Sequence, residues 1–228
     1  MKLGIILTPD NRSKAYIQKL VENNIILNSI LFMNDNRREK PYSEDIIKIS
    51  KKNGFDITKS VKDILTENNL TFKEFNFVDI NHPHLVEHIK NNEEGFLIFT
   101  GGGILKKEIL NSGVKFIHFH PGIVPNYRGS TCFYYSILNE GNSGVTAYIM
   151  DEKLDTGDIV YQKKFNKPDH IFVDDVFDPY IRSETLVELI KKDILKKNNY
   201  KKQNPLDGET FFIIHPVLKH ISILSCIS

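Results

Sequence analysis

Two histidines, His118 and His120, stand two residues apart at the end of the apolar run VKFIHFHP (114–121). Side chains two apart in a strand project to the same face, so we expect the two imidazoles to lie together. Imidazole titrates near neutral pH and can accept or donate a proton during a reaction. Pro121 and Gly122 end the strand at once. We therefore expect the second imidazole at the rim of a cleft.

The histidine pair allows three interpretations from the residues alone. One imidazole can be a hydrogen-bonded core group, both can take part in catalysis, or both can bind a metal ion. A His-x-His pair is a weak metal signal, and no third ligand stands at a diagnostic spacing. We therefore expect no metal.

The amino-terminal half alternates apolar runs with helical patterns. Strands are predicted over 3–7, 25–33, 95–100 and 114–121, an extended segment over 72–80, and helices over 13–23, 44–52, 60–69 and 82–92. Ser13 is the candidate cap of the first helix. This order predicts an α/β fold, an open, mostly parallel, doubly wound (Rossmann-like) sheet with helices on both faces. Ligands bind such sheets beyond the carboxyl ends of the strands.

The pattern changes after residue 143. Alternating stretches at 144–152 and 157–165 predict strands that pair with each other or extend the sheet. Residues 183–199 have the pattern of one long amphipathic helix. We expect a catalytic domain over 1–200 and a small C-terminal appendage over 201–228. The appendage would be a strand and a short helix that cover the core or form a subunit interface, with a homodimer as one outcome.

Composition excludes several classes of function. Lys plus Arg is 30 and Asp plus Glu is 29, and a net charge of +1 gives no reason to expect nucleic-acid or membrane-surface binding. Cys132 and Cys226 share no metal-ligand spacing and are expected to be buried free thiols. No apolar run is long enough to cross a bilayer, and the start MKLGIILTPD is typical of a strand. We expect a cytoplasmic protein.

Two segments, HFHPGIVPNYRGS (118–130) and GVTAYIMDEKLDTGDI (144–159), carry a family pattern. In order and spacing they resemble the folate-dependent formyltransferases. The signature of that family runs Asn-x-His-Pro-(Gly/Ser), Pro-x-(Tyr/Phe)-(Arg/Lys)-Gly, Gly-Val-Thr and Asp-x-Gly-x-Ile. The resemblance is strong over residues 95–165. It implies transfer of a formyl group from 10-formyltetrahydrofolate to a primary amine.

The resemblance also implies the catalytic residues. The family's histidine falls on His120 and its aspartate on Asp155, while His118 replaces its asparagine. The imidazole would move a proton, the carboxylate would support its charged form, and a donor at residue 118 would stabilise an oxyanion. The replacement leaves open a working variant, a slower enzyme or a protein that has lost the reaction; we favour the first, because His120 and Asp155 remain. Tyr148, where many members carry histidine, is expected only to line the cleft.

The resemblance places two stretches beside the pterin ring of the folate. They contribute Gly101, Gly102, Gly103, Ile104, Asp151 and Leu154. Glycine permits close approach of the backbone to a flat ligand, but three glycines can also form a tight turn and nothing more. Both interpretations stay open.

The PNYRG loop is expected to contact the acceptor through Tyr127, Arg128, Gly129 and Ser130. Arg128 would hold a substrate phosphate with two hydrogen bonds or pin the loop by a salt bridge, and we favour the second. Ser130 and Thr131 are expected to cap the helix that follows.

Elimination favours one acceptor class. Few residues follow the motif and the charge is near neutral, which disfavours initiator tRNA. The stretch LTPDNRSKAY contains no glycine, which disfavours a backbone phosphate loop like that of the purine-pathway enzyme. We expect a small-molecule nucleotide-linked amino sugar, used for surface polysaccharides. The alternatives are a protein that binds folate or nucleotide sugar without efficient turnover, and a metal-dependent hydrolase of formyl-folate.

Overall fold

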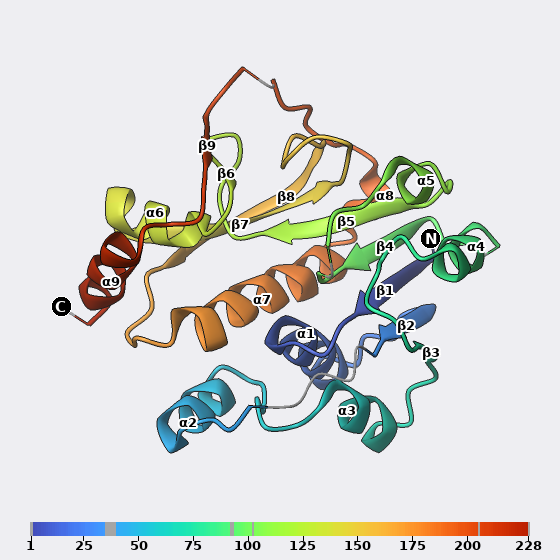
Figure 1. The fold of residues 1–228 in the computed structure, drawn as a ribbon, viewed down its shortest axis with the longest axis horizontal. Helices are drawn as coiled ribbons and strands as arrows, with labels where there is room; N and C mark the ends of the chain where they lie inside the picture. Colours follow the sequence, from blue (N-terminus) through green and yellow to red (C-terminus); the bar gives the residue numbers. More distant parts are fainter. Residues whose placement is uncertain (1, 35–39, 92–93, 102, 205, 228) are drawn as a thin grey trace. The chain divides into compact units, whose positions relative to one another are not determined.

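The structure is a computed structural model that describes residues 2–34, 40–91, 94–101, 103–204 and 206–227. The chain divides into two compact units, Met1–His118 and Phe119–Ser228. Figure 1 labels their helices and strands.

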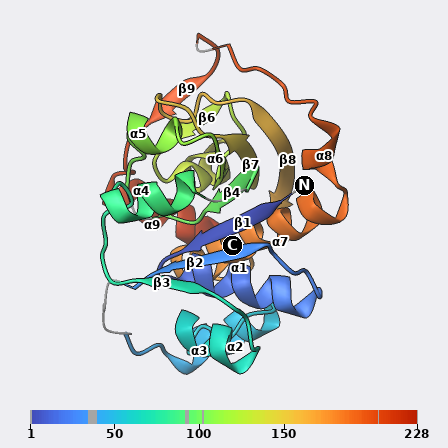
Figure 2. The same ribbon diagram turned by 90° about the vertical axis from the view of Figure 1, so that its right-hand side faces the viewer.

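Strands and helices alternate through the first unit. Its elements are β1 (Leu3–Leu7), α1 (Asn11–Glu22), β2 (Ser29–Met33), α2 (Glu44–Lys52), α3 (Val61–Glu67), β3 (Lys73–Phe75), α4 (Pro83–Lys90), β4 (Phe96–Phe99), α5 (Lys107–Leu110) and the start of β5 (Lys115–His120). Figures 1 and 2 show α1 and α3 on one side of β1–β3 and α4 on the other. β1, β2 and β4 are almost wholly buried because helices cover both faces, whereas the edge strand β3 is largely accessible.

The second unit contains an antiparallel pair of strands with helices packed around it. Its elements are β6 (Tyr127–Gly129), α6 (Cys132–Glu140), β7 (Asn142–Ile149), β8 (Ile159–Asn166), a π-helical turn (Val173–Phe177), α7 (Asp178–Lys191), α8 (Ile194–Lys197), β9 (Glu209–Phe211) and α9 (Pro216–Ser225). Both α6 and α7 pack against β7, and α9 lies beside α6 (Figure 1).

Among the described residues the main sheet has seven strands, in the order β3-β2-β1-β4-β5-β7-β8. β1 pairs in parallel with β2 and β4, β2 with β3, and β4 with β5. β7 and β8 pair antiparallel with each other and also extend the sheet at its edge, so both predicted outcomes for these strands are present. The predicted mostly parallel, Rossmann-like α/β sheet is confirmed.

The tail adds a second, two-stranded sheet. β9 pairs in parallel with β6, with Tyr127 opposite Glu209 and Gly129 opposite Phe211. The predicted strand and short helix of the tail are confirmed, but the strand joins β6 and not the main sheet.

Several predicted boundaries are wrong for identifiable reasons. Asp10 caps α1, because its side chain accepts from the Ser13 N–H, so Ser13 is not the cap. The extended segment over 72–80 shortens to β3 (Lys73–Phe75). The long helix predicted over 183–199 begins earlier, at Asp178. It breaks at Asp193, which has a left-handed φ of 52°.

Two smaller expectations are also tested. Cys132 and Cys226 are buried free thiols, as predicted. Within the described part of the chain, every helix is too short or too polar to span a bilayer.

Candidate active site

His120 ends β5 and lies in the core of the second unit. Its side chain is 2% exposed. Its Nε2 lies 2.8 Å from the backbone carbonyl oxygen of Tyr127. A Cβ on Gly122 would lie 2.8 Å from this nitrogen and 2.7 Å from that oxygen, so only glycine lets the turn fold back so closely. The prediction of a rim position is wrong, because the chain after Pro121 returns over the imidazole.

Asp155 faces the other side of the imidazole. Its Oδ2 lies 3.4 Å from Nδ1 of His120 and accepts a 2.6 Å hydrogen bond from the Gly129 N–H. Asp155 is buried and has a left-handed φ of 54°. The expected contact between His120 and Asp155, which lie far apart in the sequence, is present in the structure.

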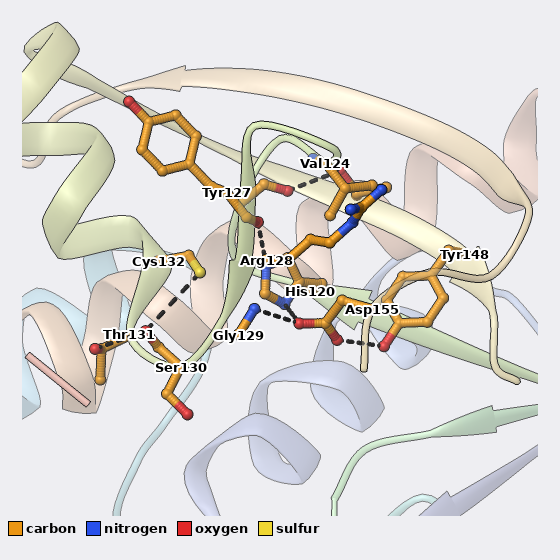
Figure 3. A network of polar contacts seen from close by, with 12 residues as sticks. His120, Val124, Tyr127, Arg128, Gly129, Ser130, Thr131, Cys132, Tyr148 and Asp155 are labelled. Atoms are coloured by element: carbon orange, nitrogen blue, oxygen red, sulfur yellow. Dashed lines mark hydrogen bonds and ion pairs between the residues drawn. The ribbon is translucent and has the colours of Figure 1, made fainter. Parts of the chain in front are cut away.

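Tyr148 completes the polar network that Figure 3 shows around Asp155. Its hydroxyl donates a 2.7 Å hydrogen bond to Oδ1 of Asp155. Burial and the nearby carboxylate raise the pKa of Tyr148 well above its ordinary value, so the hydroxyl stays protonated and donates. Sequence reasoning assigned Tyr148 no such role. The available signal was the family resemblance, which implies histidine, another polar ring, at this position in many members.

Hydrogen bonding and burial define the protonation state of His120. A carbonyl oxygen can only accept, so the Nε2–H donates to Tyr127 and Nδ1 carries the lone pair. Burial lowers the pKa of His120, and the charge of Asp155 opposes this effect. The imidazole is therefore neutral at neutral pH and can take up one proton at Nδ1, beside the carboxylate.

Neighbouring strands and a helix fix the backbone around His120. The Thr146 hydroxyl of β7 donates to the Gly122 carbonyl at 2.7 Å and accepts from the Val124 N–H at 3.1 Å. Arg182 of α7 forms a buried ion pair with Asp178 at 2.6 Å and donates to the carbonyl of Phe119. These bonds hold the end of β5 and the turn after it from two sides.

His118 belongs to the first unit, on the half of β5 that pairs with β4. Its ring is half-buried, with Nδ1 3.3 Å from the carbonyl oxygen of Phe99. Because that oxygen accepts, Nδ1 carries the proton, and a neutral ring then has no second N–H to offer.

The glycine loop also lies in the first unit. Gly101 and Gly103 have positive φ values of 153° and 116°, and Gly102 lies outside the described residues. Ile104 is 87% exposed. The Asn81 side chain holds this loop, donating to the Ile104 carbonyl at 2.9 Å and accepting from the Lys106 N–H at 2.7 Å. Sequence reasoning did not identify Asn81, since a single asparagine in a loop carries no distinctive signal.

The second stretch assigned to the folate is an exposed turn in the second unit. Asp151 accepts from the Thr156 hydroxyl at 2.9 Å and from the Lys153 N–H at 3.1 Å. Leu154 is 61% exposed. Both residues sit on the turn that carries Asp155.

The residues expected to contact the acceptor differ in burial: Tyr127 and Arg128 are buried, and Ser130 is exposed. Tyr127 is buried and stacks on Phe211, with ring centroids 5.4 Å apart, whereas Ser130 is exposed. Arg128 is 3% exposed and donates to the carbonyls of Asn204 and Asp207 at 3.1 and 2.8 Å. This geometry supports the interpretation in which Arg128 pins the loop, here to the tail, although these partners are backbone carbonyls and not the carboxylate of the expected salt bridge.

The predicted capping by Ser130 and Thr131 is wrong. Thr131 occupies the position before α6 with a left-handed φ of 54° and makes no side-chain capping bond. Its hydroxyl accepts instead from the Ile214 N–H of the tail at 3.0 Å.

Burial also decides the chemistry of the nearby thiol. The pKa of Cys132 is raised to about 12, chiefly by burial, so Cys132 is not a nucleophile at neutral pH. In the part of the chain that the structure describes, no three His, Cys, Asp or Glu side chains are grouped to hold a metal ion.

Comparisons with known proteins identify the family of this chain. Residues 44–175 match the model of the family described as formyl transferase, which is more than half of the chain. The chain is 30% identical over 196 residues to the methionyl-tRNA formyltransferase of Clostridioides difficile, covering 84% of this chain and 59% of that protein. The chain thus spans about half the length of the curated relatives it matches.

Solved structures share the fold. A sugar N-formyltransferase from Shewanella has a TM-score of 0.60 at 18% identity, covering 100% of this chain and 89% of that one. An N-formyltransferase from Helicobacter canadensis, in complex with folinic acid and dTDP-3-aminofucose, has a TM-score of 0.62 at 18% identity, covering 100% and 80%. With the match over residues 44–175, these findings show that the chain belongs to the formyl transferase family.

Proposed function

We propose that this protein transfers a formyl group from 10-formyltetrahydrofolate to the primary amine of a nucleotide-linked amino sugar. The observation that carries the proposal is the buried pair of His120 and Asp155, 3.4 Å apart, with a lone pair on Nδ1. Family membership supports the donor, because this family is built around folate-dependent formyl transfer.

The proposed reaction needs a site for one proton. The amine nitrogen attacks the formyl carbon, a new C–N bond forms, and a tetrahedral centre carries the negative oxygen. The amine proton passes to Nδ1 of His120, where Asp155 stabilises the imidazolium. The oxyanion then re-forms the carbonyl, the bond from carbon to the folate nitrogen breaks, and that nitrogen takes the proton from His120. We assign His118 as the donor to the oxyanion in its protonated form, because Nδ1 of the neutral ring already faces the Phe99 carbonyl.

The acceptor class rests on weaker support than the donor. Structural neighbours that span this whole chain include sugar N-formyltransferases, one of them with a dTDP-linked amino sugar. A net charge of +1 offers little attraction for the tRNA backbone. Against this, curated relatives that match in sequence include methionyl-tRNA formyltransferases, which makes initiator tRNA the second candidate.

An acceptor panel separates the candidates. Purified protein is incubated with 10-formyltetrahydrofolate and dTDP-, GDP- or UDP-linked 3-amino or 4-amino sugars, or with initiator methionyl-tRNA, and products are identified by mass spectrometry. We expect one amino sugar to be formylated and a His120→Asn variant to be inactive on it. Formylation of the tRNA alone would favour the second candidate. Tight binding of folate or sugar with no product would mean a protein without efficient turnover.

A further inference from the structure

The described tail residues, 201–204 and 206–214, are bonded to the β6 loop and to the turn of Asp155, which together form the His120–Asp155 site. Lys201 forms a backbone bridge with Ile159, and β9 pairs with β6. The side chains of Arg128 and Gln203 add polar links between the tail and these loops. The tail thus contributes directly to the contacts around Asp155.

Asp155 needs such support because of its backbone. Its φ of 54° lies in the left-handed region, which costs a residue with a Cβ about 1 kcal/mol or more. The residues before it, 151–154, are exposed. A strained residue on an exposed turn keeps its conformation only where neighbouring groups hold it.

The Gln203 side chain stabilises the backbone of the Asp155 turn. Its Nε2 donates to the carbonyls of Asp155 and Gly157, at 3.1 and 2.6 Å. Its Oε1 accepts from Nη2 and Nε of Arg128, at 3.0 and 3.3 Å. The side-chain amide therefore joins the turn of Asp155 to the strand that carries Gly129.

The same strand contacts the carboxylate directly. Gly129, which follows Arg128, donates its N–H to Oδ2 of Asp155 at 2.6 Å. Gln203 and Gly129 thus fix the backbone and the carboxylate of Asp155 to one three-residue strand, β6. A shift of the turn would move Oδ2 away from both Gly129 and His120.

We propose that Gln203 is a positioning residue, which holds the Asp155 turn against β6 so that the carboxylate faces His120. The effect expected on catalysis rests on the proposed function, whereas the effect expected on the position of Asp155 does not.

The decisive variant is Gln203→Glu. A carboxylate at this position still accepts from Arg128, so the tail stays attached. It has no N–H for the carbonyls of Asp155 and Gly157, and its negative oxygen repels them. We expect kcat for formyl transfer to fall about 10- to 100-fold, with KM for the folate changed by less than about twofold.

A spectroscopic readout tests the position without turnover. Arg–Gly occurs once in the sequence, at Arg128–Gly129, so carbonyl-¹³C arginine with ¹⁵N glycine gives a single amide resonance. A hydrogen bond to a carboxylate moves that proton downfield and slows its exchange with solvent. In Gln203→Glu we expect an upfield shift, as in Asp155→Asn, and exchange at least about tenfold faster.

Gln18 provides the matched control, since its Nε2 donates to the Asp56 carbonyl at 3.1 Å and its Oε1 accepts from the Asp56 N–H at 2.8 Å. Gln18→Glu should leave kcat and the Gly129 resonance as in the unmodified protein. The proposal is overturned if Gln203→Glu leaves the Gly129 resonance in place, or moves it without lowering kcat. If the unmodified protein transfers no formyl group to any acceptor, the proposed function fails, and the Gly129 resonance alone decides the role of Gln203.

Discussion

Hydrogen bonding at His118 gives this residue a different chemistry from the asparagine it replaces. Its Nδ1 faces the Phe99 carbonyl at 3.3 Å, so a neutral ring has no proton left for an oxyanion. An amide donates at every pH, whereas this imidazole donates from Nε2 only when it is protonated. The replacement therefore makes the proposed oxyanion contact dependent on pH.

His118→Asn tests this difference. We expect the rate of the variant relative to the unmodified protein to increase steadily as the pH is raised, because only imidazole loses its donor. The measurement is kcat of both proteins between about pH 5.5 and pH 9. This interval lies on both sides of the ordinary histidine pKa of about 6.5. A ratio that stays constant over this range would rule out donation from His118.

Tyr148→Phe removes one hydrogen bond to Asp155 and preserves the ring. The hydroxyl donates to Oδ1 at 2.7 Å, opposite the oxygen that faces His120. We expect kcat to fall about tenfold, with the dissociation constant of folate unchanged, because bonds that orient a catalytic group have effects of this size.

The control for Tyr148→Phe is Tyr148→His, which restores a ring N–H donor. Recovery of part of the lost rate in this variant would support the orienting role. Full activity of the phenylalanine variant would contradict it.

At the residue level, the sequence predicted the pairing of His120 with Asp155 through the family pattern. It did not predict the burial of His120, because a Pro-Gly turn indicates where a strand ends and not the direction of the chain that follows. It also did not predict the bond from Tyr148, since an aromatic residue on a buried strand is most simply a packing residue.

Among the elements, the β6–β9 pair joins the PNYRG loop to the tail. Gly129 has a φ of 99°, and a Cβ there would lie 2.1 Å from the Phe211 carbonyl oxygen. No side chain fits this position unless β9 moves away. The pairing therefore depends on one glycine.

Gly129→Ala should lower the free energy of unfolding by about 2–4 kcal/mol, because it combines backbone strain with a clash against another strand. Denaturant unfolding measures this difference. Gly141→Ala is the matched control, with a φ of 68° and no atom within 4 Å of the added Cβ, and strain alone costs about 1 kcal/mol. Equal losses in the two variants would mean that β6 and β9 do not pair.

The helical period of the sequence predicted α2 over its full length, from Glu44 to Lys52, and in the structure Ser43 caps it and charges suit both ends. It placed the start of α7 too late. Pro179 in the first turn favours a helix start, and the buried pair of Asp178 and Arg182 lies within that turn and the next. The partner of β9 was not predictable, since a three-residue strand carries no information about which edge it joins.

For the whole molecule, alternating strands and helices were enough to predict a mostly parallel sheet, because crossover connections impose that architecture. The place of the tail depends on long-range contacts such as Arg128 with Asp207, 79 positions apart. Such contacts leave no periodic signal. The predicted boundary at residue 200 consequently separates Gln203 from the turn that it contacts.

The central claim is that His120, neutral and buried beside Asp155, accepts the proton during formyl transfer. The most direct test is the pH dependence of kcat/KM in the unmodified protein and in Asp155→Asn. Because burial lowers the pKa of His120, activity should be lost on the acidic side with a midpoint below the ordinary histidine value of about 6.5.

In Asp155→Asn we predict a rate about 10²- to 10³-fold lower and a midpoint at still lower pH, because the carboxylate that raises the pKa of His120 is gone. An unchanged rate and midpoint in this variant would contradict the account.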